Sequence, residues 1–296
     1  VEGMRAATGI LTERGGMTSH AALVARGWGK CCIVGCSALK IDMEAKTVSM
    51  GGKTYKEGDT LSLNGTKGTV YEGAVATINA SENELFKQFM QLVDKYRTMG
   101  VRTNADNPKD AQQAIDFGAE GIGLFRIEHM FYGENSEKPL AILRKMILSG
   151  STEERKKWLN ELLPYIKVAV KGTMQVMNGK PVTFRLIDPP LHEFVPHTQE
   201  NVEALAKELG IAAEELNKRI VALEEVNPMM GLRGVRLGIT YPEITETQFR
   251  ALFEAEAELR KEGFDPHLEI MVPLTISVTE LKHQKAICDR VHAEVE

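Results

Sequence analysis

The 296-residue sequence has no apolar run longer than a short strand, no block of Lys or Arg, and only four cysteines. Without an apolar segment of about 20 residues, it predicts no bilayer-spanning helix, and its first residues lack a charged head followed by an apolar stretch. The formal net charge is -5, so we expect no nucleic-acid or membrane partner, although local basic pockets for small phosphates remain open. These absences favour a cytoplasmic enzyme that acts on small molecules, with organellar targeting left open.

The cysteines raise the alternative of a zinc site, because Cys31, Cys32 and Cys36 lie close together. Consecutive residues on a strand point to opposite faces, so Cys31 and Cys32 do not readily share one metal ion. No second Cys-x-x-Cys or His-x-x-x-His pair follows them. Small thiols in a reducing compartment explain these residues better. We therefore predict no metal site within this chain.

By pattern, the chain divides into three parts. Residues 1–78 alternate short β-like runs with Gly-rich turns and predict a compact β-rich unit with one helix, which Thr18 or Ser19 caps and Gly27 ends. Residues 79–100 predict a helical linker that opens with a capping-box pattern. Residues 101–296 alternate strands and helices, which is typical of a parallel sheet or barrel.

The third part has four clear strand patterns, at residues 101–104, 121–126, 182–187 and 268–272. We count the last as about the fifth strand of an eight-stranded barrel. Helices are predicted between the strands, at residues 138–148, 152–170, 201–225 and 243–262. Three successive strands carry an arginine or an acidic residue near their C-terminal ends, which is the rim that carries the chemistry in a parallel barrel.

A histidine stands at the start of the helix predicted in the first part, within residues 15–22, GGMTSHAA. Free backbone N–H groups and the positive end of the helix dipole attract a phosphoryl group, and the glycines let it approach closely. The same dipole disfavours imidazolium, so a neutral His20 is suited to take up a phosphoryl group and pass it on. Taken alone, the motif also fits a packed histidine, and Thr18 also fits a simple helix cap.

Arginines accompany the ends of the predicted strands in three clusters. Arg126 ends one strand, Arg185 lies in the next, and Arg233 stands with Arg236 in a Gly-rich segment further on. A planar guanidinium suits bidentate capture of phosphate or carboxylate. Any one of these arginines is more simply a surface ion pair, but together they describe an anion site.

The histidine segment, continued by VARG at residues 24–27 and KCC at residues 30–32, closely resembles the swivelling phosphohistidine domain of the pyruvate, phosphate dikinase family. The arginine clusters and DPPLHEF at residues 188–194 resemble the phosphoenolpyruvate (PEP)-binding barrel of the same PEP-utilising enzymes. The resemblance covers nearly the whole chain. It implies an α/β protein in which a swivelling β/β/α phosphohistidine domain precedes a partial TIM-type (β/α)8 barrel.

Roles for particular residues follow from the resemblance. It implies that His20 carries the phosphoryl group and that Arg126 and Arg185 bind substrate, with Arg233 as a third member. Thr18 matches a regulatory phosphorylation site of plant members of the family. The resemblance assigns no role to two histidines near these arginines, His129 and His192, and both are expected to be structural. Cys288 does not match the family's catalytic cysteine. Ile127 replaces the usual threonine, so it either weakens substrate orientation or faces the core.

The implied reaction interconverts ATP, phosphate and pyruvate with AMP, pyrophosphate and PEP through a phosphohistidine. We expect the chain to be an internal fragment that is inactive alone, with ATP and phosphate bound by domains outside it. Mg²⁺ is the expected cofactor, with ligands beyond residue 296, and the full-length protein is expected to be a homodimer. Related motifs keep two alternatives open, a PEP synthase and a phosphocarrier similar to Enzyme I of the sugar phosphotransferase system.

Overall fold

The computed structural model describes residues 2–76, 83–132 and 136–296, and the chain forms two compact units. Unit 1 comprises residues 1–94 and unit 2 comprises residues 95–296. In the described part of the chain, no helix combines the length and the apolar character needed to cross a bilayer. Ser81 and Glu82, which begin the predicted capping box, lie outside the described residues.

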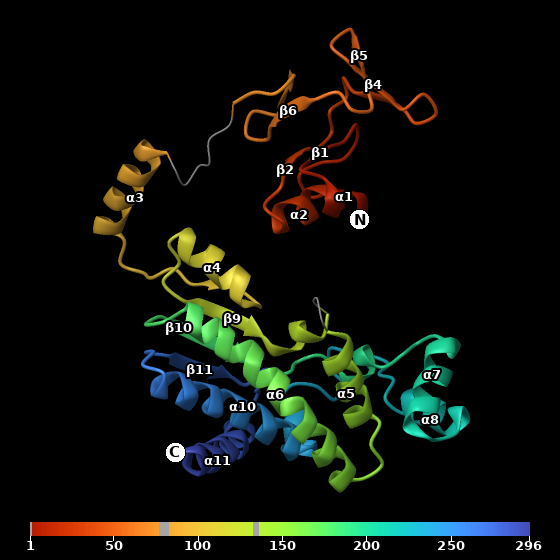
Figure 1. Cartoon of the computed structure of the whole chain (residues 1–296), viewed down its shortest axis with the longest axis vertical. Helices are drawn as coiled ribbons and strands as arrows, with labels where there is room; N and C mark the ends of the chain where they lie inside the picture. The colour runs from red at the N-terminus through yellow and green to blue at the C-terminus, as the bar shows by residue number, and fades with distance from the viewer. Residues whose placement is uncertain (1, 77–82, 133–135) are drawn as a thin grey trace. The chain divides into compact units, whose positions relative to one another are not determined.

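Unit 1 is built from short strands and small helices (Figure 1). A parallel pair holds its first part together, with β1 (Gly9–Leu11) beside β2 (Cys31–Ile33) and α2 (His20–Gly27) between them in sequence. The Lys30 ammonium donates to the carbonyl oxygens of Met4 at 3.2 Å and Ala7 at 2.6 Å, which ties the N-terminal segment to β2. The remaining elements are α1 (Glu2–Ala6), the antiparallel strands β3 (Lys40–Asp42), β4 (Thr47–Met50) and β5 (Lys53–Lys56), and the hairpin of β6 (Leu61–Asn64) and β7 (Thr69–Glu72).

Helix α3 (Glu84–Tyr96) lies in the segment predicted to be a helical linker. It begins after Asn83, whose side-chain oxygen accepts the backbone N–H groups of Leu85 at 3.0 Å and Phe86 at 3.3 Å. An asparagine in this position satisfies donors that have no partner within the helix. The expected helix at this point in the sequence is therefore present.

Unit 2 contains a parallel sheet in the order β11, β10, β9, β8. Its strands are β8 (Thr103–Asn104), β9 (Ile122–Arg126), β10 (Pro181–Arg185) and β11 (His267–Met271). Its helices are α4 (Pro108–Asp116), α5 (Glu137–Ile147), α6 (Thr152–Val176), α7 (Gln199–Leu209), α8 (Ala213–Val221), α9 (Val235–Thr240), α10 (Pro242–Lys261) and α11 (Val278–Val295), with short 3-10 turns η2 (Ile127–Phe131) and η3 (Leu191–Phe194).

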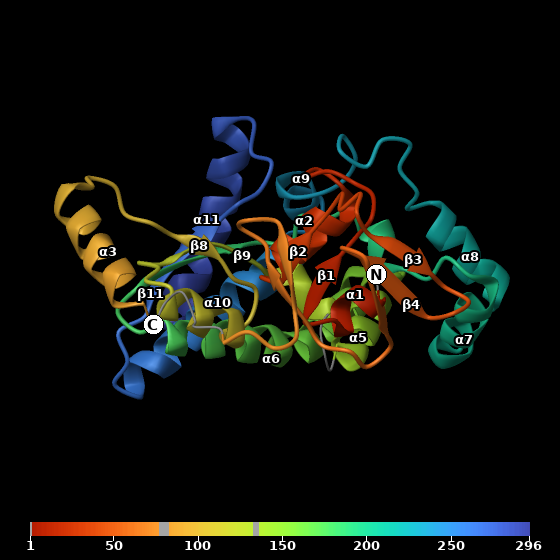
Figure 2. The same ribbon diagram turned by 90° about the horizontal axis from the view of Figure 1, so that it is seen from above.

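The core of unit 2 lies between the sheet and the long helices α6 and α10, which pack against each other (Figures 1 and 2). Phe125 on β9 and Phe184 on β10 are buried there, with ring centroids 4.8 Å apart. Because successive residues of a strand point to opposite faces, the next residues, Arg126 and Arg185, face away from this core. The two arginines are paired in the β9–β10 register, so they stand side by side at the ends of their strands.

Three expectations about unit 2 are wrong in detail. The helix predicted at residues 201–225 is two helices, α7 and α8, because Gly210 adopts a left-handed conformation (φ 70°) that ends α7. Helix α6 continues to Val176, past the predicted end at residue 170. Strand β11 is the fourth strand of the sheet in the described residues, not the fifth, because the chain between β10 and α10 forms α7, α8 and α9 and adds no strand to the sheet.

Candidate functional site

The His20 loop, which we define as residues 12–19, crosses from β1 to α2 in unit 1. Ser19 is the N-cap of α2, and its hydroxyl oxygen accepts the Ala22 N–H at 3.4 Å. The alternative that Thr18 caps the helix is therefore wrong, and Thr18 lies exposed in the turn before the cap. His20 is the first residue of α2 and is also exposed, so both groups are accessible from solvent.

Two glycines hold the His20 loop against the segment that follows β2. The Thr12 carbonyl accepts the Cys36 N–H at 2.9 Å. Beside this bond, Gly35 adopts φ 69° and approaches Gly15 so closely that a Cβ on Gly35 would lie 2.5 Å from the Gly15 carbonyl oxygen. A residue without a Cβ is therefore required at position 35 for the loop to take this path.

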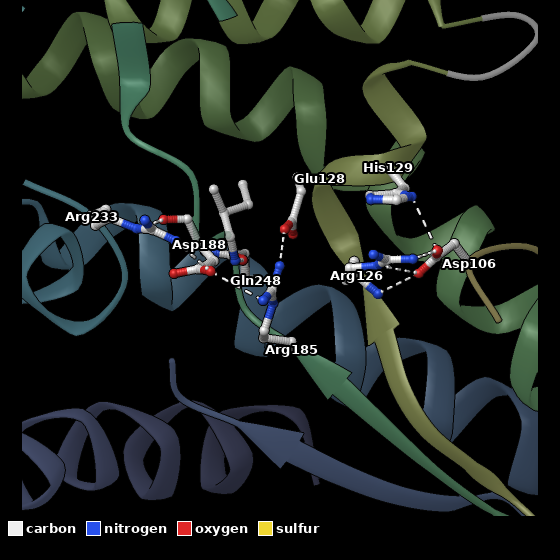
Figure 3. Close-up of polar contacts among 9 residues, drawn as sticks. Asp106, Arg126, Glu128, His129, Arg185, Asp188, Arg233 and Gln248 are labelled. Carbon is white, nitrogen blue, oxygen red and sulfur yellow. Dashed lines mark hydrogen bonds and ion pairs between the residues drawn. The ribbon is translucent and has the colours of Figure 1, made fainter. Parts of the chain in front are cut away.

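The candidate anion site of unit 2 lies at the C-terminal rim of its parallel sheet (Figure 3). Asp106, just after β8, receives three hydrogen bonds from Arg126 at the end of β9. Its Oδ1 accepts the backbone N–H at 2.9 Å and Nε at 3.2 Å, and its Oδ2 accepts Nη2 at 2.5 Å. His129 Nδ1 lies 3.0 Å from the same Oδ2. This side-on contact uses Nε and Nη2 of the Arg126 guanidinium, and no hydrogen bond joins its Nη1 to another described residue.

Arg185, at the end of β10, lies between two carboxylates. Its Nη2 donates to Glu128 Oε1, and its Nη1 lies 3.0 Å from Asp188 Oδ2. Arg233 Nη2 donates to the same Asp188 oxygen at 2.8 Å, so Asp188 joins two guanidinium groups. The three arginines singled out from the sequence are thereby close to one rim, where their carboxylate partners hold them in place.

Glu128 is the most deeply buried carboxylate of the rim, with only 2% of its surface exposed. Burial raises the pKa of its side chain, and the Arg185 guanidinium opposes that rise only in part. Three buried polar atoms around this pair have no hydrogen-bond partner among the described residues: Glu128 Oε2, Arg185 Nε and Asp188 Oδ1. Unsatisfied buried groups are uncommon in folded proteins and mark a place where a further polar partner fits.

A glutamine of α10 holds the backbone between Arg185 and Asp188 in place through a hydrogen bond. The buried Gln248 accepts the Ile187 N–H at 2.8 Å through its side-chain oxygen and donates to the Ile244 carbonyl at 3.2 Å. Both polar atoms of the Gln248 side chain are therefore hydrogen-bonded. This makes the turn rigid, because a movement that broke either bond would leave a buried polar group unpaired.

Other residues noted in the sequence have different environments. Ile127 is 1% exposed and belongs to the hydrophobic core, as the second of its two expected alternatives has it. Arg236 does not join the rim cluster but donates from Nε to the Gly231 carbonyl at 2.9 Å. His192 Nδ1 is buried without a hydrogen-bond partner in the described part of the chain.

The carboxylates were the part of the site that sequence reasoning did not assign. Asp106 was missed altogether, and no function was predicted for Glu128 or Asp188. A signal for Asp106 existed, because it follows the predicted strand at residues 101–104 and so belongs to the same rim as the arginines. Its pairing with Arg126, 20 residues away, was not readable from the sequence.

Two protein-family models match the chain. Residues 1–68 match the mobile domain of PEP-utilising enzymes, and residues 80–296 match their PEP-binding domain. The chain therefore belongs to the PEP-utilising enzyme family. The expected fold class is confirmed, with a β-rich mobile phosphohistidine domain before a PEP-binding domain of parallel β/α elements. The predicted boundaries at residues 78 and 100 stay predictions.

The chain is similar to pyruvate, phosphate dikinases over its whole length. It is 50% identical to that of Clostridium symbiosum over 296 residues, which cover 100% of this chain and 34% of the relative. It is 47% identical to that of Giardia intestinalis, over 99% of this chain and 33% of the relative. It is 48% identical to chloroplastic pyruvate, phosphate dikinase 1 of Arabidopsis thaliana, over 100% of this chain and 30% of the relative. The chain thus spans about a third of the length of these relatives.

Proposed function

We propose that this chain is the phosphohistidine and PEP-binding part of a pyruvate, phosphate dikinase, acting together with the further parts that its relatives carry. The observation that carries the proposal is the similarity to these dikinases over the whole chain at 47–50% identity. The proposed reaction interconverts ATP, phosphate and pyruvate with AMP, pyrophosphate and PEP. The relatives named above are all pyruvate, phosphate dikinases, which favours this reaction over that of a PEP synthase or an Enzyme I-like carrier.

In the proposed PEP half-reaction, an imidazole nitrogen of His20 forms a P–N bond to the phosphorus of PEP. The bond between phosphorus and the enol oxygen breaks, and the enolate of pyruvate leaves and takes up a proton on carbon. The exposed position of His20 at the start of α2 supports its role as acceptor. The charge developing on the phosphoryl oxygens favours nearby N–H donors and the helix N-terminus.

Arg126, Arg185 and Arg233 are proposed to bind the phosphate and carboxylate of PEP. The paired register of Arg126 and Arg185 supports this role, because two planar guanidinium groups on neighbouring strands present several N–H donors to one ligand. Their carboxylate partners fix the direction of each fork before the ligand arrives, so less side-chain freedom is lost on binding.

Mg²⁺ is proposed as cofactor, with ligands beyond residue 296. The described residues contain no group of three or more His, Cys, Asp or Glu side chains that could hold a metal ion. The rim carboxylates Asp106, Glu128 and Asp188 already face guanidinium groups, which makes them poor first ligands for a second cation. When bound, the metal would supply positive charge to the phosphate and enolate oxygens. A homodimer, a cytoplasmic location and regulation through Thr18 complete the proposal.

The two half-reactions provide the test. In the complete protein, Arg126→Ala or Arg185→Ala should slow isotope exchange between PEP and pyruvate about tenfold or more, because a charge-assisted contact is worth roughly 1.5–3 kcal/mol. Exchange between ATP and AMP should hardly change. Phosphorylation of the protein by labelled PEP should be lost in His20→Asn.

A matched control is Arg155→Ala, which removes an arginine of α6 that is paired with Glu243 at 2.6 Å, away from the rim. This change should lower the melting temperature and affect both exchanges alike. If the rim variants behave in the same way as Arg155→Ala, the arginines are structural and the proposed binding role is wrong.

A further inference from the structure

The charges at the rim are balanced before any ligand is bound. Three guanidinium groups face three carboxylates, in the pairs Arg126 with Asp106, Arg185 with Glu128 and Asp188, and Arg233 with Asp188. If all six groups are ionised, their formal charges cancel. A ligand that carries a phosphate and a carboxylate therefore meets arginines whose positive charge is already compensated. Additional positive charge, or the loss of a negative charge from the cluster, therefore favours binding of such a ligand.

Glu128 is the carboxylate with the least compensation. Asp106 receives three hydrogen bonds from Arg126, and Asp188 faces two guanidinium groups. Glu128 has one side-chain partner, Arg185, through Oε1, while Oε2 is buried and has no hydrogen-bond partner among the described residues. Glu128 shares the Arg185 guanidinium with Asp188. When an anionic ligand also binds Arg185, Glu128 is therefore the carboxylate of the cluster that is most easily protonated.

Charged and titratable groups among the described residues act on the Glu128 carboxylate from two sides. From the β10 side they are Arg185 and Asp188, and from its own segment they are Arg126 and Tyr132. Arg185 and Arg126 favour the ionised carboxylate, whereas Asp188 opposes it. A polyanionic ligand on Arg185 acts in the same direction as Asp188 and as burial, so it favours the protonated carboxyl.

We propose that Glu128 takes up a proton from solvent when a phosphate- or carboxylate-bearing ligand binds Arg185, so that capture of the anion is coupled to uptake of about one proton. The inference rests on the proposed function, in which the phosphate or the carboxylate of PEP binds Arg185. No covalent bond other than O–H changes: the proton comes from water or buffer, joins a carboxylate oxygen of Glu128, and returns when the ligand leaves. The neutral carboxyl no longer repels the ligand and keeps an O–H donor beside it.

The test is calorimetric titration of the complete protein with PEP at about pH 8, where the ligand itself is fully ionised and carries no exchangeable proton. His20→Asn is used as the background so that no phosphoryl transfer follows, and Mg²⁺ is kept saturating. Titrations in two buffers of different ionisation enthalpy give the number of protons taken up. We expect that number to be lower by about one in Glu128→Gln than in the parent.

The pH dependence of binding gives a second readout. Uptake of one proton weakens PEP binding about tenfold for each unit of rising pH within the window where uptake is complete. Glu128→Gln, which is neutral at every pH, should lack this slope. Glu243→Gln is the matched control, because Glu243 is also a buried glutamate paired with an arginine but lies on the outer helices. It should keep the proton uptake of the parent.

The outcomes separate this inference from the proposed function. PEP binding that needs Arg185 but takes up equally many protons in the parent and in Glu128→Gln would overturn the role of Glu128 and leave the proposed function standing. Absence of any Arg185-dependent binding would overturn both. If Glu128→Gln does not fold, infrared difference spectra of the parent decide: a new carbonyl band of a protonated carboxyl group on PEP binding supports the inference, and its absence contradicts it.

Discussion

Gly35→Ala should disturb the His20 loop specifically. Gly35 follows β2 and has φ 69°, and an added Cβ would lie 2.5 Å from the carbonyl oxygen of Gly15. That oxygen is backbone, so it cannot move aside as the end of a flexible side chain would. The matched control is Gly68→Ala, because Gly68 has nearly the same φ of 65° and no atom within 4 Å of its added Cβ.

Both substitutions place alanine in the left-handed region, but only Gly35→Ala also creates an overlap with Gly15. Placing alanine in the left-handed region costs roughly 1–2 kcal/mol, which is partly offset by about 0.4–1 kcal/mol because the unfolded chain is also restricted. Gly68→Ala should therefore lower the free energy of unfolding by about 1 kcal/mol or less. Gly35→Ala adds the overlap with Gly15, and overpacking typically costs about 1–3 kcal/mol. We expect a total of about 1–4 kcal/mol for this variant, roughly 1–3 kcal/mol more than for Gly68→Ala.

Urea unfolding of unit 1 measures the difference. The chain has two tryptophans, of which Trp28 lies in unit 1 and Trp158 in unit 2, so a Trp158→Phe background leaves a fluorescence probe that reports on unit 1. The midpoint should fall clearly more for Gly35→Ala than for Gly68→Ala. At temperatures where both variants are folded, only Gly35→Ala should slow phosphorylation of His20. Equal midpoint shifts in the two variants would refute the close approach at Gly15 as the reason for the glycine.

Two further predictions concern charge. Thr18→Glu should suppress phosphorylation of His20 in the complete protein, because it places a negative charge two residues before the acceptor of a phosphoryl group; Thr18→Gln should not, and unchanged transfer in Thr18→Glu would contradict the electrostatic coupling. Hydrogen bonds from Arg97 and from the Val101 N–H lower the pKa of Glu120 to about 2. Since this folded-state pKa lies below the ordinary 4.5, the ionised pair stabilises the fold above about pH 4.5 and this contribution is lost as the pH falls towards 2. Acid unfolding of Glu120→Gln, followed by circular dichroism, should therefore depend less steeply on pH in this range.

The sequence determined the local structure of the chain. Ser19 before an apolar helical stretch that closes with Gly27 defined α2. His20 had to stand at its start, because a cap and a helix-ending glycine act within a few residues. The strands at residues 121–126 and 182–187 were likewise predicted from short apolar runs. The structure ends them at Arg126 and at Arg185, the second of them two residues before its predicted end. The break at Gly210 was missed because glycine is tolerated within a helical pattern, and only the backbone conformation shows that α7 ends there.

Only the tertiary structure decided which carboxylates pair with the arginines of the anion site. The sequence predicted that arginines gather at one rim, since parallel strands end together. It did not determine that Arg126 meets Asp106 across 20 residues or that Arg233 meets Asp188 across 45 residues. Such pairs depend on strand register and on the turns after each strand, which local patterns do not encode. Burial then raises the pKa of Glu128, which is only 2% exposed. The reason is that the free energy of a charge depends on what surrounds it in space.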